Sequence, residues 1–93
     1  MLDKNKIPAD LYGQEDKKDP IVYCVIKFQK MFWLITEYNA EEKEAFGFAQ
    51  IHEGCGELGY IYIPELEEVL KKYFGWSITY VEKPLSQVKK ELQ

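Results

Sequence analysis

The chain has 93 residues, of which 46% are hydrophobic and 15% aromatic, and its formal net charge is −4. A chain of this length has too little interior for two independently stable units, so we expect a single domain over residues 1–93. The negative charge disfavours nucleic acid and anionic lipid as partners, and the sequence contains no apolar run near the roughly 20 residues that a membrane helix needs. Its two cysteines, Cys24 and Cys55, follow no paired spacing and no secretory signal, so we expect a cytoplasmic protein without membrane association.

The first half of the chain alternates between polar connections and β-rich segments. Residues 1–6 are polar and predicted to be frayed, whereas residues 7–12 carry enough apolar surface for a short docked turn or helix. Residues 14–20 are charged and end in proline, which predicts a solvated loop that leads into an extended segment. Three strands of an antiparallel meander are then predicted at residues 21–29, 31–38 and 45–52. In the first of them the even positions are all apolar and are expected to share one buried face: Val22, Cys24, Ile26 and Phe28.

The second half contains the clearest helix. A fourth strand is predicted at residues 58–63, Pro64 suits the first turn of a helix, and Gly75 can end it. Four apolar residues follow the spacing of a single buried stripe: Leu66, Val69, Leu70 and Tyr73. Residues 76–82 alternate as a fifth strand, and Pro84 opens a short terminal helix. We therefore predict an α+β domain with a mainly antiparallel sheet of about five strands, one main helix packed on one face, and a short C-terminal helix.

Short segments along the chain carry a family resemblance. They read LYGQE at 11–15, DPIVY at 19–23, WLITEY at 33–38, FGF at 46–48, ELGY at 57–60, PELE at 64–67 and KPLS at 83–86. Together they cover residues 7–88, and on them the chain resembles the DUF2958 family of small bacterial and mobile-element proteins. The resemblance implies a compact α+β domain, often encoded near plasmid, phage or conjugative-element functions, and it brings no activity, cofactor or site residue with it.

A glycine-rich stretch from Gly54 to Gly59 satisfies the pattern G-x-G-x-x-G. In a dinucleotide site these glycines lead directly into a helix whose N-terminus faces the pyrophosphate. Here residues 60–63 read as a strand, and Glu53 and Glu57 would repel phosphate. We therefore predict a hairpin turn at this stretch.

His52 and Cys55 stand three residues apart and are the only candidates for a metal site or a catalytic pair. A closed zinc site needs about four ligands, and a nucleophile with its base needs a third group that orients the base. The sequence identifies neither, so we predict no catalytic residue, no metal and no cofactor, and we favour a non-enzymatic protein. Cys24 is expected in the core, where free cysteine behaves as a small hydrophobe.

Three glutamates could form a binding site. Glu15, Glu37 and Glu57 each fall in a segment that carries the resemblance, in a loop or near a strand end. If they converge, they would form an acidic pocket suited to a cation, a basic partner or proton transfer. The alternative is that they are solvated charges beside strands.

Tyr60 and Tyr62 form a second candidate surface. Because side chains alternate along a strand, both tyrosines point away from Ile61 and Ile63. We expect the isoleucines to meet the main helix and the tyrosines to be at least partly exposed.

The leading functional hypothesis is a non-enzymatic interaction module that binds another macromolecule, expected to be a protein, and that belongs to a mobile element or phage as an accessory protein. Two alternatives stay open. One is a ligand-binding or cation-binding domain, or a small enzyme, that uses the three glutamates; the other is binding of single-stranded nucleic acid on an aromatic sheet face. The sequence specifies neither the partner nor the oligomeric state.

Overall fold

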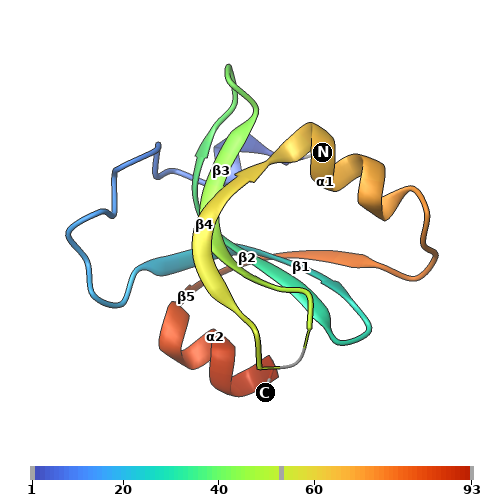
Figure 1. Ribbon diagram of the computed structural model, residues 1–93. Helices are drawn as coiled ribbons and strands as arrows, with labels where there is room; N and C mark the ends of the chain where they lie inside the picture. Colours follow the sequence, from blue (N-terminus) through green and yellow to red (C-terminus); the bar gives the residue numbers. More distant parts are fainter. Residues whose placement is uncertain (1, 53, 93) are drawn as a thin grey trace.

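The computed structural model describes residues 2–52 and 54–92 of the chain. In order, the elements of these residues are η1 (Lys4–Lys6), β1 (Ile21–Phe28), β2 (Met31–Asn39), β3 (Glu44–Gln50), β4 (Glu57–Tyr62), α1 (Ile63–Leu70), β5 (Ser77–Pro84) and α2 (Leu85–Leu92). The strands form one sheet in the order β4-β3-β2-β1-β5, and each neighbouring pair is antiparallel (Figure 1). The predicted α+β fold, with a five-stranded antiparallel sheet and two helices, is confirmed.

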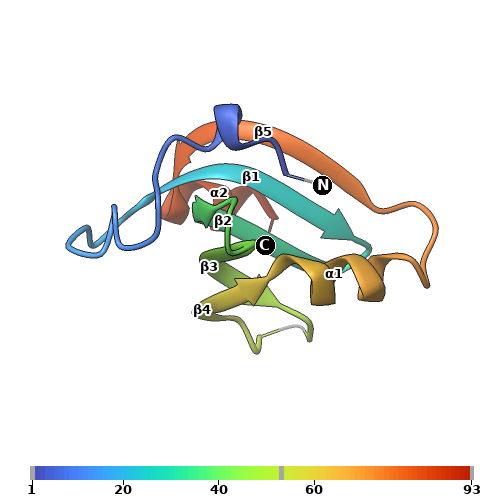
Figure 2. The same cartoon turned by 90° about the horizontal axis from the view of Figure 1, so that it is seen from above.

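Tight local turns produce the meander from β1 to β4. Between β1 and β2, Gln29 has a φ of 53°, the left-handed conformation that two-residue hairpin loops favour. Between β2 and β3, Lys43 has a φ of 56°, and the Asn39 side chain accepts a hydrogen bond of 3.0 Å from the Glu42 amide. After α1 the chain returns along the outer side of β1 as β5, and Figure 2 shows the resulting order of strands from above.

The central strand β2 is buried on both faces. Trp33 and Ile35 point to one side, where they pack in a cluster with Leu66 and Leu70 of α1. The alternate residues Phe32 and Leu34 point to the other side, where they pack in a second cluster with Leu85 and Val88 of α2. The two helices therefore lie on opposite faces of the sheet, and the core has two layers of apolar contacts.

The helices begin close to the prolines that predict them, but two boundaries differ from the predictions. The helix α1 ends at Leu70, before the predicted terminator Gly75, and Pro84 is the last residue of β5 instead of the first of α2. Pro64 lies in the first turn of α1, where its missing N–H costs no hydrogen bond, and Gly75 beyond the helix has a φ of 87°. At the start of α2 the Asp19 carboxylate accepts hydrogen bonds from the Ser86 amide at 2.9 Å and the Ser86 hydroxyl at 2.6 Å. These bonds hold the pKa of Asp19 below its ordinary value of 3.8. Within the described residues, neither helix is long and apolar enough to cross a membrane.

Three further details differ from the expectations. The segment expected to be frayed contains η1, whose N-terminus is capped by Asp3; Met1 itself lies outside the described residues. Val22 is buried, but it packs in the α2 cluster whereas Cys24 packs in the α1 cluster, because the register of β1 against β5 shifts between these two residues. The predicted stripe of α1 is buried at Leu66 and Leu70, while Val69 stays exposed and Tyr73 lies exposed beyond the end of the helix.

A second irregularity shapes the middle of the sheet. The register of β2 against β3 shifts between Ile35 and Glu37, and at this point the backbones of the two strands approach closely beside Gly47. A Cβ atom at Gly47 would overlap the carbonyl group of Leu34, whose carbon would lie 2.9 Å away. By contrast, a Cβ atom at Gly59, the register partner of Gly47 on β4, would meet no atom within 4 Å.

Candidate functional site

The site begins where β1 and β2 part. Their register runs from Phe28 opposite Met31 to Cys24 opposite Ile35, and beyond that pair the two strands separate. The N-terminal segment occupies part of the opening, because the carbonyl oxygen of Ala9 accepts a hydrogen bond of 3.0 Å from the Tyr38 amide. Residues 9–20 therefore lie against the sheet and form one wall of the site.

Gln14 bridges the opening between the separated strands. Its Oε1 accepts a hydrogen bond of 2.7 Å from the Ile21 amide, and its Nε2 donates to the carbonyl oxygens of Ile21 at 2.9 Å and Thr36 at 2.7 Å. The amide side chain thus replaces the backbone partners that β1 and β2 would otherwise give each other. Gln14 is only 5% exposed, so the prediction of a solvated loop is wrong at this residue.

The side chain of Glu37 in β2 holds the same loop through hydrogen bonds. The side chain is 4% exposed, and its two oxygens accept hydrogen bonds from the Tyr12 amide at 2.7 Å and the Gln14 amide at 2.9 Å. Hydrogen bonds to a charged group are worth about 1.5–3 kcal/mol each, so this carboxylate is a strong restraint on the loop. It holds Tyr12 with a φ of 67°, a left-handed conformation that is unfavourable for a bulky side chain.

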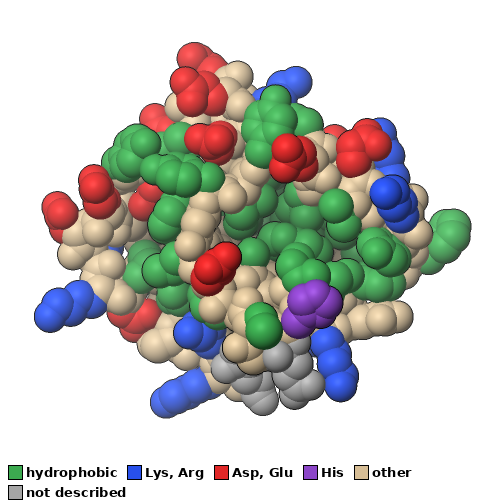
Figure 3. Space-filling model, in the orientation of Figure 1, with side chains coloured by type: hydrophobic (Ala, Val, Ile, Leu, Met, Phe, Trp, Pro, Cys, Tyr) green, Lys and Arg blue, Asp and Glu red, His purple; other side chains and the backbone are tan. Residues whose placement is uncertain are grey.

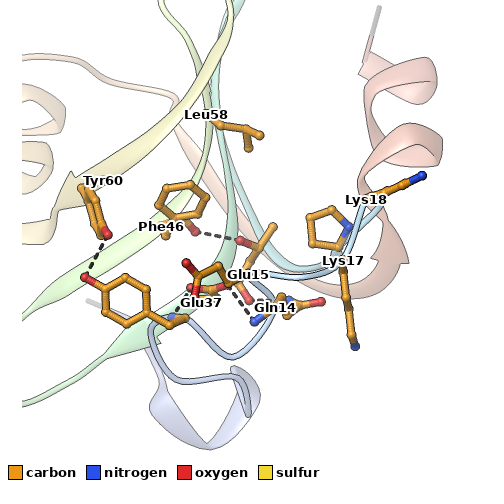
Figure 4. A pocket seen from close by; sticks show the side chains of 11 residues that line it. Gln14, Glu15, Lys17, Lys18, Glu37, Phe46, Leu58 and Tyr60 are labelled. Carbon is orange, nitrogen blue, oxygen red and sulfur yellow. Dashed lines mark hydrogen bonds between the residues drawn. The ribbon is translucent and has the colours of Figure 1, made fainter.

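A cavity of about 250 Å³ lies between this loop and strands β2, β3 and β4 (Figure 4). Its walls combine aromatic, aliphatic and charged side chains: Tyr12, Gln14, Glu15, Lys17, Lys18, Pro20, Thr36, Glu37, Phe46, Leu58 and Tyr60. The Thr36 hydroxyl donates a hydrogen bond of 3.0 Å to the carbonyl oxygen of Phe46, which joins β2 to β3 at the floor of the cavity.

Three aromatic rings form one end of the cavity. The Tyr60 hydroxyl donates a hydrogen bond of 3.0 Å to the Tyr12 hydroxyl. The centroids of the Tyr12 and Tyr60 rings are 6.4 Å apart with planes at 69°, and those of Phe46 and Tyr60 are 5.2 Å apart with planes at 75°. These are edge-to-face arrangements, which the ring quadrupoles favour. The rings therefore stabilise one another and define a fixed aromatic corner.

The hydrogen bond to Tyr12 is the main influence on the ionisation of Tyr60. Its pKa is raised to about 12, first by the hydrogen bond to Tyr12, then by loss of solvent, and further by the nearby negative charges of Glu44 and Glu15. Glu15 and Glu37 both line the cavity, and Figure 4 shows them between the aromatic corner and the opposite end of the cavity. At physiological pH the corner therefore presents a neutral phenol beside carboxylates.

The other end of the cavity carries two lysines. Lys17 and Lys18 line the wall, but in Figure 4 their ammonium groups point away from Tyr60 and Phe46. The aliphatic parts of the lysine side chains contribute to the wall while the charged ends extend into solvent. On the face seen in Figure 3, most Asp and Glu side chains lie in the upper half of the view and most Lys side chains in the lower half.

The structure brings together three of the five residues singled out from the sequence. Glu15, Glu37 and Tyr60 line the same cavity, whereas Glu57 and Tyr62 do not. Glu57 begins β4, opposite Ala49, and Tyr62 ends it. The prediction for the two faces of β4 is confirmed, because Tyr60 and Tyr62 are 53% and 46% exposed while the adjacent isoleucines are buried in the α1 cluster.

Most of the residues that line the cavity were not singled out from the sequence, among them Tyr12, Gln14 and Phe46. Tyr12 and Gln14 belong to the segment LYGQE, in which an aromatic residue and an amide stand close to Glu15. Phe46 and Phe48 stand two residues apart in β3 and therefore point to the same face of the sheet; Phe46 lines the cavity and Phe48 packs in the α2 cluster. The alternative of a solvated Glu37 is wrong, since that side chain is buried.

The glycine-rich stretch is a turn, as predicted. The Cys55 amide donates a hydrogen bond of 3.0 Å to the carbonyl oxygen of His52, Gly54 has a φ of 81°, and β4 follows. Glu53 lies outside the described residues. His52 and Cys55 are exposed, and within residues 2–52 and 54–92 His, Cys, Asp and Glu form no group of three or more that could hold a metal ion.

Cys24 lies in the core, as the sequence predicted. It is fully buried in the α1 cluster, and burial raises the pKa of its thiol to about 12. The thiolate, which is the reactive form, is therefore suppressed at this position.

The fold and the cavity define a small α+β domain with one helix on each face of an antiparallel sheet and an aromatic cavity of about 250 Å³ beside edge strand β4. The family model of DUF2958, described as a protein of unknown function, matches residues 2–83. The chain belongs to the DUF2958 family, which confirms the resemblance seen in the sequence. No curated protein and no solved structure matches the chain.

Proposed function

We propose that the protein is a non-enzymatic interaction module that binds a short segment of another protein at the aromatic cavity. The observation that carries the proposal is the rigid corner of Tyr12, Phe46 and Tyr60, held open by the loop that Gln14 and Glu37 fix. Aromatic side chains with exposed surface and a polar rim are typical of protein-binding sites. The corner is built before any partner arrives, which lowers the entropic cost of binding.

The position of the cavity suits an extended segment. Leu58 and Tyr60 line the cavity from β4, which is an edge strand of the sheet. A peptide that lies along an edge strand gains hydrogen bonds from the main chain, and a pocket beside the edge then selects one of its side chains. Catalysis is less well supported, because both oxygens of Glu37 already accept backbone hydrogen bonds that shape the loop.

Selection from a random peptide library displayed on phage tests the proposal with the full chain as bait. We expect enriched peptides that bind the wild-type protein and the Tyr62→Ala variant equally, and that bind the Tyr60→Ala variant about tenfold or more weakly. Tyr62→Ala is the matched control, since Tyr62 is a similarly exposed tyrosine on the same side of β4 but does not line the cavity. Enriched peptides that bind Tyr60→Ala as well as wild type, or no enrichment at all, would refute the proposal.

A further inference from the structure

The aromatic corner has the electrostatic character of a cation site. The face of an aromatic ring carries negative charge density, so a cation placed over Tyr or Phe is attracted by about 0.5–2 kcal/mol. Tyr12, Phe46 and Tyr60 stand at steep angles to one another and form adjacent walls of the corner. The pKa of Tyr60 is raised to about 12 mainly by its hydrogen bond to Tyr12, and the nearby negative charges of Glu44 and Glu15 add smaller contributions.

Two carboxylates in the cavity could pair with a bound cation. Glu15 and Glu37 line the cavity next to the rings, and Glu37 is almost fully buried. Each Glu37 oxygen accepts one backbone hydrogen bond, which leaves each with a further lone pair for a donor in the cavity. The ammonium groups of Lys17 and Lys18 point away from the corner, so they do not neutralise these carboxylates from within.

The volume of the cavity favours a single side chain over a larger ligand. Pockets for cofactors and drug-sized ligands have volumes of about 300–1,000 Å³. The cavity here has about 250 Å³, which suits one long side chain. A long basic side chain also matches the arrangement of apolar and charged residues around the cavity. Its aliphatic stem can contact Leu58 and the aromatic rings while its charged end meets Glu15.

From these features we infer that the cavity binds an arginine or lysine side chain of the partner protein's segment, with the charged group held between the aromatic corner and Glu15. The inference rests on the function proposed above and names the anchor residue of the bound segment. The chain's net charge of −4 adds a long-range attraction for a basic segment.

Titration of the ¹⁵N-labelled full chain with single-residue probes tests the inference by NMR. The probes are N-acetyl-arginine amide, N-acetyl-lysine amide and the neutral isostere N-acetyl-citrulline amide. We expect the two cationic probes to shift the backbone amide signals of Thr36, Phe46 and Tyr60, with an affinity that falls as salt is added, because salt screens exposed charges. The citrulline probe should not shift these signals. Equal binding of the citrulline and arginine probes would overturn the inference.

Matched variants test which carboxylate and which tyrosine contribute to binding of the arginine probe. Glu15→Gln should weaken binding of the arginine probe about two- to fivefold, the range for an exposed ion pair, and Tyr60→Ala should weaken it about tenfold. Glu57→Gln and Tyr62→Ala change the same residue types on β4 outside the cavity, and both should bind the probe as wild type does. An equal loss in Glu57→Gln and Glu15→Gln would show general attraction by the acidic surface and refute the site.

The peptide selection separates this inference from the proposed function. Enriched peptides that need Tyr60 and share an arginine or lysine support both. Peptides that need Tyr60 but share no basic residue would overturn the inference and leave the interaction module in place. If no enriched peptide needs Tyr60, both fail.

Discussion

Replacing Gln14 by alanine should destabilise the fold by about 2–3 kcal/mol. The change removes three hydrogen bonds of 2.7–2.9 Å, each worth about 0.5–1.5 kcal/mol net, which brackets a loss of about 1.5–4.5 kcal/mol. The Ile21 groups are partly buried and can regain water, whereas the Thr36 carbonyl is buried, so the middle of that range applies. A domain of this size is stable by roughly 5–14 kcal/mol, so the loss is a large fraction of the total.

Urea unfolding followed by tryptophan fluorescence measures this loss, and hydrogen exchange locates it. The amide of Ile21 donates to Gln14 and should exchange faster in Gln14→Ala. Gln87→Ala is the matched control, because Gln87 is exposed and makes a single 3.5 Å contact with Glu91; its unfolding free energy should stay within about 0.5 kcal/mol of wild type. If Gln14→Ala is as stable as Gln87→Ala, and Ile21 exchange is unchanged, the bridging role of Gln14 is wrong.

Three further predictions follow from the glycine contacts, the α2 cap and the cysteines. Gly47→Ala should lower the unfolding free energy by about 3 kcal/mol or more through backbone overlap, while Gly59→Ala should leave it within about 0.5 kcal/mol; equal urea midpoints would contradict the close strand approach. Because the pKa of Asp19 is lowered on folding, its carboxylate stabilises the protein fully at pH values well above the unfolded pKa of 3.8. This stabilisation is lost as pH falls below 3.8 and through the lowered pKa of the folded state, so the difference in urea midpoint between wild type and Asp19→Asn should shrink there; a constant difference would contradict the role of the charge. Iodoacetamide should label Cys55 and leave Cys24 unmodified in the folded protein, as mass spectrometry of digests can show, and labelling of both at similar rates would contradict the burial of the core thiol.

The fold follows closely from local signals in the sequence. Alternation of apolar residues, the hairpin glycines and Pro64 lie within the segments that they specify, so strands predicted at 45–52 and 58–63 occur at Glu44–Gln50 and Glu57–Tyr62. The two register shifts escaped prediction, because a shift in register depends on the pairing between two strands and does not change the alternation pattern within one strand. The change of face between Val22 and Cys24 is a direct result.

The candidate site was only partly predictable, for two different reasons. Strand alternation places Tyr60 with Leu58 and separates it from Glu57, which is three residues away, so the exclusion of Glu57 from the cavity was within reach of the sequence. The role of Gln14 was not, because its partners lie 7 and 22 residues further along the chain and form only after β1 and β2 separate. A glutamine among charged residues has the same sequence pattern whether it is solvated or buried.

The conformation of Tyr12 links the buried polar groups to the candidate site. Among the residues that the structure describes, two others with a side chain, Gln29 and Lys43, also have positive φ, and both lie in hairpin connections whose geometry requires it. Tyr12 lies in no hairpin, and a left-handed conformation costs a bulky residue of order 1–3 kcal/mol unless its surroundings fix it. The Glu37 carboxylate fixes the Tyr12 amide, and the Tyr60 hydroxyl fixes the phenol. The buried Glu37 carboxylate and the strained Tyr12 backbone therefore meet at one wall of the cavity. This arrangement is expected where a protein maintains the shape of a binding site.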